Sequence, residues 1–296
     1  MQLSIIIPVY NAEKTIQRTI HSLKKLDNCK QKSEIIFVND GSTDNTKKII
    51  DAYISENNIK NIILLNKENG GSATARNAGL EISKGQWVFF LDADDELLFE
   101  PLYWINKYPE KTAVGFSVVY YKNKSRYFKL KPPKISNDNF LDILTSRNPF
   151  SPSSLIFKKD KLAHMFDPGF SFLEDWLFWI MNPKVCHDMV AIKSITSVKF
   201  HIHGNNKTSD QNQNGIYRIK IAEEVFKKYN GKLSKKQKNN LIIQKNIGLI
   251  QQAIRPLSLF SLGFPCDFIL FIKLVIYMLF QRFSEKLGPY AVSGKE

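Results

Sequence analysis

The sequence predicts an α/β fold in which a mostly parallel sheet is flanked by helices and followed by a helical C-terminal region. Short, apolar, β-branched runs alternate with amphipathic helical segments over the first hundred of the 296 residues. Such alternation implies right-handed crossovers between parallel strands. After about Asp210 the composition shifts to long helical segments. A hydrophobic fraction of 43% and a charged fraction of 24% are typical of a globular chain.

The first hundred residues contain four predicted strands and three predicted helices. The strands are short buried runs, LSIIIP, EIIFVND, NIILLN and QWVFFLD. The helices follow the first three strands, at residues 12–26, 44–56 and 72–82, with apolar residues at helical spacing. Polar clusters come directly after each strand: YNAE, DGSTDNT, ENGGSATARN and DADDE. Because ligands of such sheets bind beyond the carboxyl ends of the strands, four loops are expected to converge on one rim.

Residues 110–205 are less regular. AVGFSVVYY and SRYFKL indicate two strands joined by KNK, as in a hairpin, and PSSLIF indicates another short strand. FLEDWLFWIM places two acids in an aromatic, helix-like run, and KSITSVKFHIHGNN is a strand that ends in His201 and His203. Helices are then predicted at residues 215–229 and 234–254, followed by FILFIKLVIYMLF at 268–280.

The acids of FFLDADDEL give the strongest local indication of a ligand. In an extended segment Asp92 and Asp94 project to the same side, and oxygen donors of this kind select Mg²⁺ or Mn²⁺. The alternative is a solvated turn followed by a helix that the acids cap. Asp95 and Glu96 are expected to cap that helix or to support the site from behind.

Three other segments allow both structural and functional interpretations. In NDGSTDNT, Asp44 can cap a helix while Asp40, at the end of its strand, faces the rim. The paired glycines of NGGSATARN allow close approach of a ligand at a helix N-terminus. The segment matches neither the GxGxxG nor the Walker A motif. Arg76, one turn into the helix, could reach a base, a phosphate or a carboxylate. The aromatic residues around Asp175 could raise its pKa or stack on a sugar, although an aromatic stripe at helical spacing is more often core.

The blocks SIIIPVYNAE, VNDGSTDNT, NGGSATARNAGL and WVFFLDADDE, in this order and spacing, resemble the family 2 glycosyltransferases with the GT-A fold. The resemblance is strong over residues 1–100, continues through FSFLEDWLFW and FHIHGNNKTS, and fades after about residue 210. It implies a catalytic domain at 1–210, with a nucleotide-binding half at 1–100 and an acceptor-binding half at 100–210. Residues 211–296 form the helical C-terminal region.

The resemblance also implies roles for individual residues. Asp92 lies on the ribose side and Asp94 ligates a metal, Mn²⁺ or Mg²⁺, that bridges the diphosphate; His203 is a candidate for the same metal. Asp175 is the general base, and Glu174 orients the acceptor or that base. The remaining nucleotide-binding positions are Pro8, Val9, Tyr10, Glu13, Asp40 and Arg76.

The implied activity is inverting transfer of a sugar from a nucleotide-diphosphate donor, UDP-linked by expectation, to a glycan or lipid-linked acceptor in surface polysaccharide synthesis. Two alternatives come from other classes. A non-catalytic basic α/β module would bind nucleic acid or anionic lipid, but acids on the rim argue against nucleic acid there. A nucleotidyltransferase would need a Gly-rich phosphate loop near the N-terminus, which PVYNAEKT does not resemble.

Charge and apolar patterning bear on location. The chain carries a formal charge of +14, and the segment from Asp210 onward holds 14 Lys and Arg against 6 Asp and Glu. Residues 268–280 are too few to span a bilayer, which needs about 20 apolar residues. Basic helices beside this segment suit peripheral attachment to an anionic leaflet, whereas a helical cap or a dimer interface is the alternative. Three dispersed cysteines and no signal peptide predict a cytoplasmic protein. If the basic region does attach to a membrane, the expected site is the inner face of the cell membrane.

Overall fold

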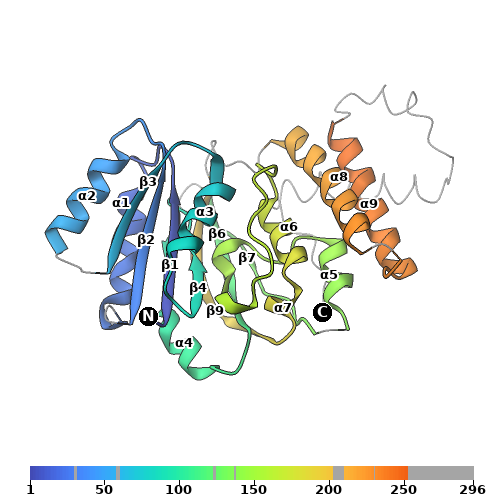
Figure 1. Ribbon diagram of the computed structural model, residues 1–296, viewed down its shortest axis with the longest axis horizontal. Helices are drawn as coiled ribbons and strands as arrows, with labels where there is room; N and C mark the ends of the chain where they lie inside the picture. The colour runs from blue at the N-terminus through green and yellow to red at the C-terminus, as the bar shows by residue number, and fades with distance from the viewer. Residues whose placement is uncertain are drawn as a thin grey trace. The chain divides into compact units, whose positions relative to one another are not determined.

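A computed structural model describes residues 1–29, 32–57, 61–122, 125–136, 138–202, 210–229 and 231–252 (Figure 1). The chain divides into two compact units. The first comprises residues 1–118 and 131–201, and the second comprises 119–130 and the described residues from 202 onward.

The sheet begins with four parallel strands, all of them predicted. They are β1 (Leu3–Val9), β2 (Ser33–Asp40), β3 (Ile62–Lys67) and β4 (Trp87–Phe90), in the spatial order β3-β2-β1-β4. Leu3 lies opposite both Ser33 and Trp87. Every residue of β2 and β4 is buried, as expected for parallel strands that are covered on both faces.

The sheet continues with antiparallel pairs and is therefore mixed. β8 (Leu155–Lys158) runs antiparallel to β4 and to β6 (Ala113–Lys122), and the short β5 (Glu96–Leu97) runs antiparallel to β9 (Met189–Ile202). The order continues β4-β8-β6-β9-β5, and β7 (Ser125–Leu130) pairs with β6, as the hairpin prediction requires. The two-residue β5 was not foreseen, because two residues carry no periodicity.

Helices cover both faces of the parallel strands (Figure 1). On one face Leu3, Ile5 and Ile7 pack in a core that includes Ile16 of α1 (Ile16–Ser22) and Ile50 of α2 (Thr46–Asn57). On the other face α3 (Gly71–Ile82) packs against β1 and β2. The alternation of strand side chains between two faces is what divides these contacts.

The helix predicted at residues 12–26 differs from the structure. α1 begins only at Ile16 and gives way to a 3₁₀ helix at Leu23–Cys29. The backbone N–H of Ala12 donates to the Thr46 hydroxyl at 2.7 Å, and residues 12–15 form a tight turn. The Glu13 N–H also donates to Asp44, at 3.1 Å, so the start of α2 and the loop before it bind the residues that precede α1.

The described part of the first unit contains three further short helices. α4 (Pro101–Lys107), α5 (Phe140–Ser146) and α7 (Pro183–Cys186) are four to seven residues long, too short for a periodic signal. The helix-like run with two acids forms α6 (Glu174–Met181).

Gly79 is expected to be essential for the seating of α3. A Cβ at this position would overlap the Ile6 side chain and lie 3.2 Å from that of Val38. Gly79→Ala should therefore lower the melting temperature, although Ala in place of Gly normally stabilises a helix by about 1 kcal/mol. A thermal melt checks this. Gly231→Ala serves for comparison, because no described residue lies within 4 Å of a Cβ there and its φ of +76° adds backbone strain alone. An unchanged melting temperature in Gly79→Ala would contradict the packing argument.

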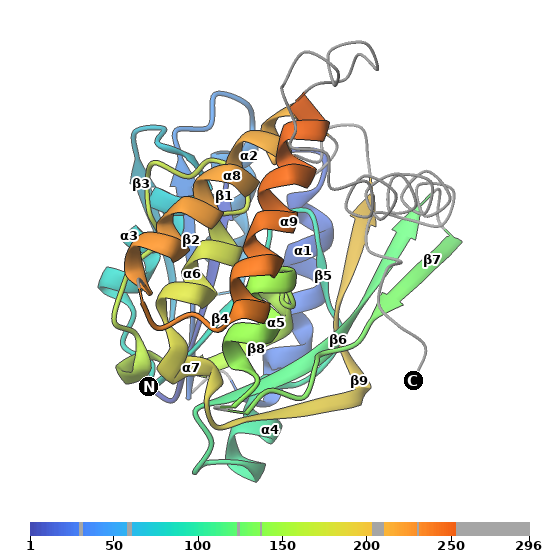
Figure 2. The same cartoon turned by 90° about the vertical axis from the view of Figure 1, so that its right-hand side faces the viewer.

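In the second unit, α8 (Gln211–Lys228) and α9 (Lys235–Gln252) pack against one another (Figure 2). Both were predicted, and Asp210 caps α8 by accepting from the Gln213 N–H at 3.0 Å. Gly215 and Gly248 face each other so closely that a Cβ on either would overlap the other's carbonyl oxygen. No helix within the described ranges is long and apolar enough to cross a membrane, and residues 268–280 lie outside those ranges.

Candidate active site

The loops that follow β1 and β2 are joined to each other at the carboxyl edge of the sheet. Asn11 adopts a left-handed backbone (φ 46°), donates its N–H to the Ser42 hydroxyl at 3.0 Å and accepts from the Thr43 N–H at 2.8 Å. The Glu13 carboxylate accepts from the backbone and side chain of Asn45 at 3.2 and 3.1 Å. The predicted convergence of these two loops is therefore confirmed.

The residues predicted to bind the nucleotide on this side differ in accessibility. Val9 is buried, Pro8 is partly buried and Tyr10 is 53% exposed at the rim. Tyr10 is thus the side chain among these three that a base could stack on. The nucleotide-binding roles of Pro8, Val9, Tyr10 and Glu13 stay predictions.

Asp40 anchors the start of α3. Its Oδ1 accepts from the Gly70 N–H at 3.0 Å and from the Lys67 ammonium at 2.5 Å, and its Oδ2 accepts from the Gly71 N–H at 2.7 Å. Asp44 accepts from the Thr46 N–H at 3.0 Å, so the predicted capping by Asp44 is confirmed. Because the Asp40 side chain is only 4% exposed, its predicted contact with a base would require these bonds to rearrange.

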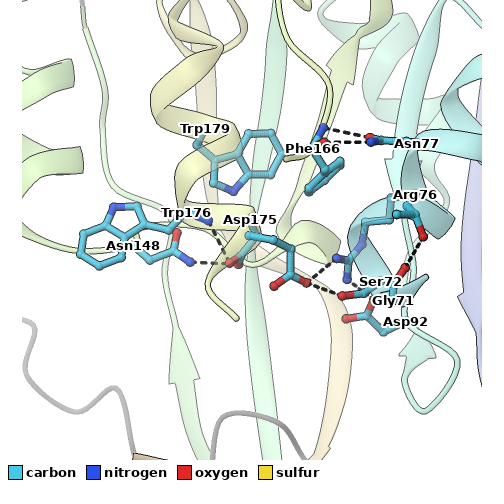
Figure 3. Close-up of polar contacts among 12 residues, drawn as sticks. Gly71, Ser72, Arg76, Asn77, Asp92, Asn148, Phe166, Asp175, Trp176 and Trp179 are labelled. Carbon is cyan, nitrogen blue, oxygen red and sulfur yellow. Dashed lines mark hydrogen bonds and ion pairs between the residues drawn. The ribbon is translucent and has the colours of Figure 1, made fainter. Parts of the chain in front are cut away.

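Arg76 joins three parts of the first unit through one guanidinium group (Figure 3). Its two terminal nitrogens each donate at 2.8 Å, one to Asp92 after β4 and the other to Glu174 at the start of α6. Ser72 also donates to Glu174, at 2.8 Å. Burial opposes the charge of Arg76, but the attraction of Asp92 and then Glu174 raises its pKa. The arginine is therefore a permanent cation that binds two acids of the candidate site, the one predicted for the ribose side and the one beside the predicted base.

The acidic loop after β4 holds surplus negative charge. Asp95 is 1% exposed, and one of its carboxylate oxygens has no partner within the part of the chain that the structure describes. Burial first, then the charges of Asp94 and Asp92, raise its pKa. The Asp94 carbonyl oxygen accepts from Arg18 of α1 at 2.5 Å, which fixes the backbone of the loop.

Of the two alternatives for Asp95 and Glu96, helix capping is wrong, and support of the loop from behind stays the prediction for Asp95. Glu96 lies in strand β5 and accepts from Lys199 at 3.1 Å and from His201, at 2.5 Å, both on β9. Asp95 is buried behind the loop, where it accepts from the His201 N–H at 3.4 Å. The chain enters a short strand at this point because β9 offers a partner for its backbone, which no local pattern reveals.

The acidic loop offers carboxylate oxygens, the type of ligand that a divalent cation prefers. Mg²⁺ is commonly held by one or two protein carboxylates, with substrate phosphates as further ligands. Asp92 and Asp94 are the two acids of the loop that the sequence predicts at the donor site, and Asp92 already binds Arg76. No group of three or more His, Cys, Asp or Glu side chains is arranged as a metal site among the described residues, and His203 lies outside them.

Asp175 occupies the first turn of α6, which begins after Leu173 in a left-handed conformation (φ 55°). Its Oδ2 accepts from the Asn148 amide at 2.9 Å and its Oδ1 accepts from the Trp176 N–H at 2.9 Å (Figure 3). Burial, then the neighbouring charge of Glu174, raise the pKa of Asp175 to about 7; the bond from Asn148 and the charge of Arg76 act in the opposite direction. A carboxylate with this pKa can accept a proton near neutral pH.

The aromatic residues of α6 belong to the core. Trp176, Phe178 and Trp179 are at most 1% exposed, so the interpretation of this stripe as packing is confirmed. The two indoles donate to backbone carbonyls, Trp176 to Leu144 at 2.8 Å and Trp179 to Phe150 at 3.3 Å. Buried rings that are satisfied in this way cannot stack on a sugar.

Sequence reasoning missed Asn148, Ser72, Lys67 and Arg18. Ser72 and Lys67 flank the glycine-rich rim loop, so their position was a usable signal. Asn148 and Arg18 reach the site from a distant loop and from a helix, and nothing in their local sequence indicates it.

The sequence and structure were compared with known proteins. A model of the family "Glycosyl transferase family 2" matches residues 4–177, more than half of the chain. The chain is 37% identical over 116 residues to TarS, a poly(ribitol-phosphate) β-N-acetylglucosaminyltransferase of Staphylococcus aureus, covering 39% of this chain and 19% of that protein. It is 29% identical over 277 residues to the uncharacterized glycosyltransferase RT0329 of Rickettsia typhi, covering 87% of this chain and 79% of that protein. The match therefore spans about a fifth of the length of TarS.

Solved structures show the same fold. TarS 1–349 of S. aureus in complex with UDP-GlcNAc matches with a TM-score of 0.63 at 22% identity, covering 90% of this chain and 77% of that one. The mannosyltransferase PcManGT of Pyrobaculum calidifontis, in complex with GDP-Man and Mn²⁺, matches with a TM-score of 0.61 at 16% identity, covering 94% of this chain and 80% of that one. The predicted GT-A fold is confirmed, and the chain belongs to glycosyl transferase family 2.

Proposed function

We propose that the chain is an inverting glycosyltransferase that moves a sugar from a UDP-sugar to a hydroxyl of a glycan or lipid-linked acceptor in surface polysaccharide synthesis. The observation that carries this proposal is the chain of contacts Asp92–Arg76–Glu174, which ends directly beside Asp175. It connects the loop expected to hold the nucleotide with a carboxylate whose pKa is raised to about 7. Donor binding and proton removal would thus occur side by side.

The residues present can perform a single displacement. The acceptor oxygen forms a bond to the anomeric carbon as the bond from that carbon to the diphosphate oxygen breaks, which inverts the configuration. Asp175 takes the proton of the attacking hydroxyl. Arg76 holds Glu174 and Asp92 in place and offsets their charge. A divalent cation, Mn²⁺ or Mg²⁺, bound by Asp94 and His203, would neutralise the charge that develops on the leaving diphosphate.

The choice of donor and acceptor rests on similar proteins. One TarS structure is a complex with UDP-GlcNAc. The name of TarS specifies transfer of N-acetylglucosamine to poly(ribitol-phosphate). A poly(ribitol-phosphate) β-glucosyltransferase of Bacillus spizizenii is 36% identical over 109 residues. These names support a UDP-sugar as the donor and a cell-surface polymer, the glycan class of the proposal, as the acceptor. We further propose residues 1–210 as the catalytic domain and 211–296 as a region for peripheral contact with the inner membrane face or for oligomer formation.

The donor and the metal assignment can be tested by binding. Ligands that bind the folded state raise its stability, by about 2.7 kcal/mol at a hundredfold excess over Kd. UDP-sugars should therefore raise the melting temperature more with Mn²⁺ or Mg²⁺ than without. The extra rise should be lost in Asp94→Ala and kept in Asp51→Ala, which removes an exposed acid of α2. A full metal-dependent rise in Asp94→Ala would contradict the metal assignment, and salt-dependent nucleic-acid binding without any donor effect would favour the non-catalytic alternative.

A further inference from the structure

Asn148 contacts Asp175, the acid proposed as the base, from a loop that lies 27 positions earlier in the sequence. It lies between α5 and β8, and its side-chain NH₂ donates to Asp175 at 2.9 Å. The side-chain oxygen of Asn148, Oδ1, accepts from the Phe150 N–H at 3.4 Å. That second bond decides how the amide group is oriented, because only with the oxygen toward Phe150 does the NH₂ group face the carboxylate.

The local sequence favours this turn. Pro149 has no N–H and keeps Asn148 out of the helical region, so α5 ends before it. The first backbone donor after Asn148 is therefore that of Phe150, and Asn side chains commonly accept from a backbone N–H two residues onward. In the dipeptide Asn148-Pro149, the side-chain oxygen is therefore bound within the loop, and the NH₂ group is left to donate to Asp175.

Helix α6, which carries Asp175, binds the chain on both sides of Asn148, once within α5 and once in the loop that follows it. The indole of Trp176 donates to the Leu144 carbonyl, and the indole of Trp179 donates to the Phe150 carbonyl. Both indoles are at most 1% exposed, so these bonds are shielded from water. Loop and helix therefore hold the Asn148–Asp175 pair at a fixed separation.

We propose that Asn148 is the positioning residue of Asp175: it fixes the orientation of the carboxylate and keeps it ionised to receive the proton of the acceptor hydroxyl. This inference rests on the proposed function. The charged groups that bear on Asp175 are Glu174 of the same helix, which disfavours ionisation, and Arg76 of α3, which favours it. Asn148 adds a neutral donor that binds the ionised form better than the protonated one.

The test uses Asn148→Leu in the full-length chain, since Leu resembles Asn in shape but cannot donate. The rate of transfer from UDP-GlcNAc is measured against pH for wild type and variant. The wild-type rate should fall as pH drops below about 7, where Asp175 takes up a proton. In the variant this limb should move up by about one pH unit, which lowers the rate about fivefold at pH 7 and less at pH 9. Asn148→Ala, which leaves room for a water to donate, should shift it less.

The control is Asn139→Ala, which removes bonds to Ser136 and Lys134 in the preceding loop but does not contact Asp175. It should leave the pH profile in place even if it lowers stability. An unshifted limb in Asn148→Leu, or an equal loss of rate at every pH, would overturn the inference.

The Asp175 carboxyl is also titrated directly by ¹³C NMR, without donor or metal. A higher pKa in Asn148→Leu than in wild type would support the positioning role even if no nucleotide sugar were transferred. An equal pKa would overturn it. The positioning of Asp175 and the glycosyltransferase activity can thus fail separately.

Discussion

Asp175→Asn is expected to reduce sugar transfer by a factor of about 10²–10⁴, the usual contribution of a general base. The amide is nearly the same size as the carboxylate, but it cannot accept the proton of the attacking hydroxyl. It should also leave the fold intact, because one oxygen can still accept from Asn148 or Trp176. Removing a partly buried charge offsets the bond that is lost.

Steady-state rates and donor titrations distinguish this effect from misfolding. The variant should bind the UDP-sugar as tightly as wild type, so that kcat falls and the apparent affinity for the donor does not. Asp160→Asn, the same change at an acid that is 67% exposed, should alter neither quantity. Transfer at the wild-type rate by Asp175→Asn would remove Asp175 from the role of base.

Arg76→Met is expected to lower the free energy of unfolding by about 3 kcal/mol and to abolish transfer. Methionine can fill the space between Phe90 and Phe166, on which the guanidinium lies at 6.0 and 5.5 Å from the ring centres. It cannot bind Asp92 or Glu174, and removing one partner of a buried ion pair leaves uncompensated charge that costs about 3–5 kcal/mol. The lower end applies because the Asp92 side chain is 28% exposed.

Urea unfolding measures this loss of unfolding free energy. The variant Arg76→Lys separates the contribution of the charge from that of the two-pronged guanidinium. Lysine keeps the charge but lacks the planar fork that reaches two carboxylates, so its stability should fall between those of wild type and Arg76→Met. Lys47→Ala provides the control, because its ion pair with Asp51 is exposed on α2 and should contribute less than about 0.5 kcal/mol. Equal midpoints for Arg76→Met and Lys47→Ala would show that the bridge does not stabilise the fold.

The parallel half of the fold could be predicted because its signals are local. Each strand is a buried apolar run, as in β2, and the helix that follows it, α2, has apolar residues at helical spacing. The antiparallel half was harder to predict, since β5 exists only through its pairing with β9.

The site divides in the same way. Asp92, Asp94 and Asp175 stand in dense polar or acidic segments that the sequence displays directly. The residues that bind these acids are not marked in the sequence, because they lie far away along the chain. Asn148 is 27 positions from Asp175, and Glu174 is 98 positions from Arg76. The roles of Asp40 and Arg76 also look different in three dimensions, since both side chains are buried in contacts with the protein itself.

The sequence by itself determined the α/β class and the succession of strands and helices along the first hundred residues. It also determined the rim loops and the acids on them. These follow from hydrophobic periodicity and from where polar residues interrupt it, both of which are properties of neighbouring residues. Only the tertiary structure decided which acid is buried, which is paired and which has a pKa near neutrality. Those properties depend on desolvation and on charges brought within a few ångströms by the fold, and residues far apart in the chain supply both.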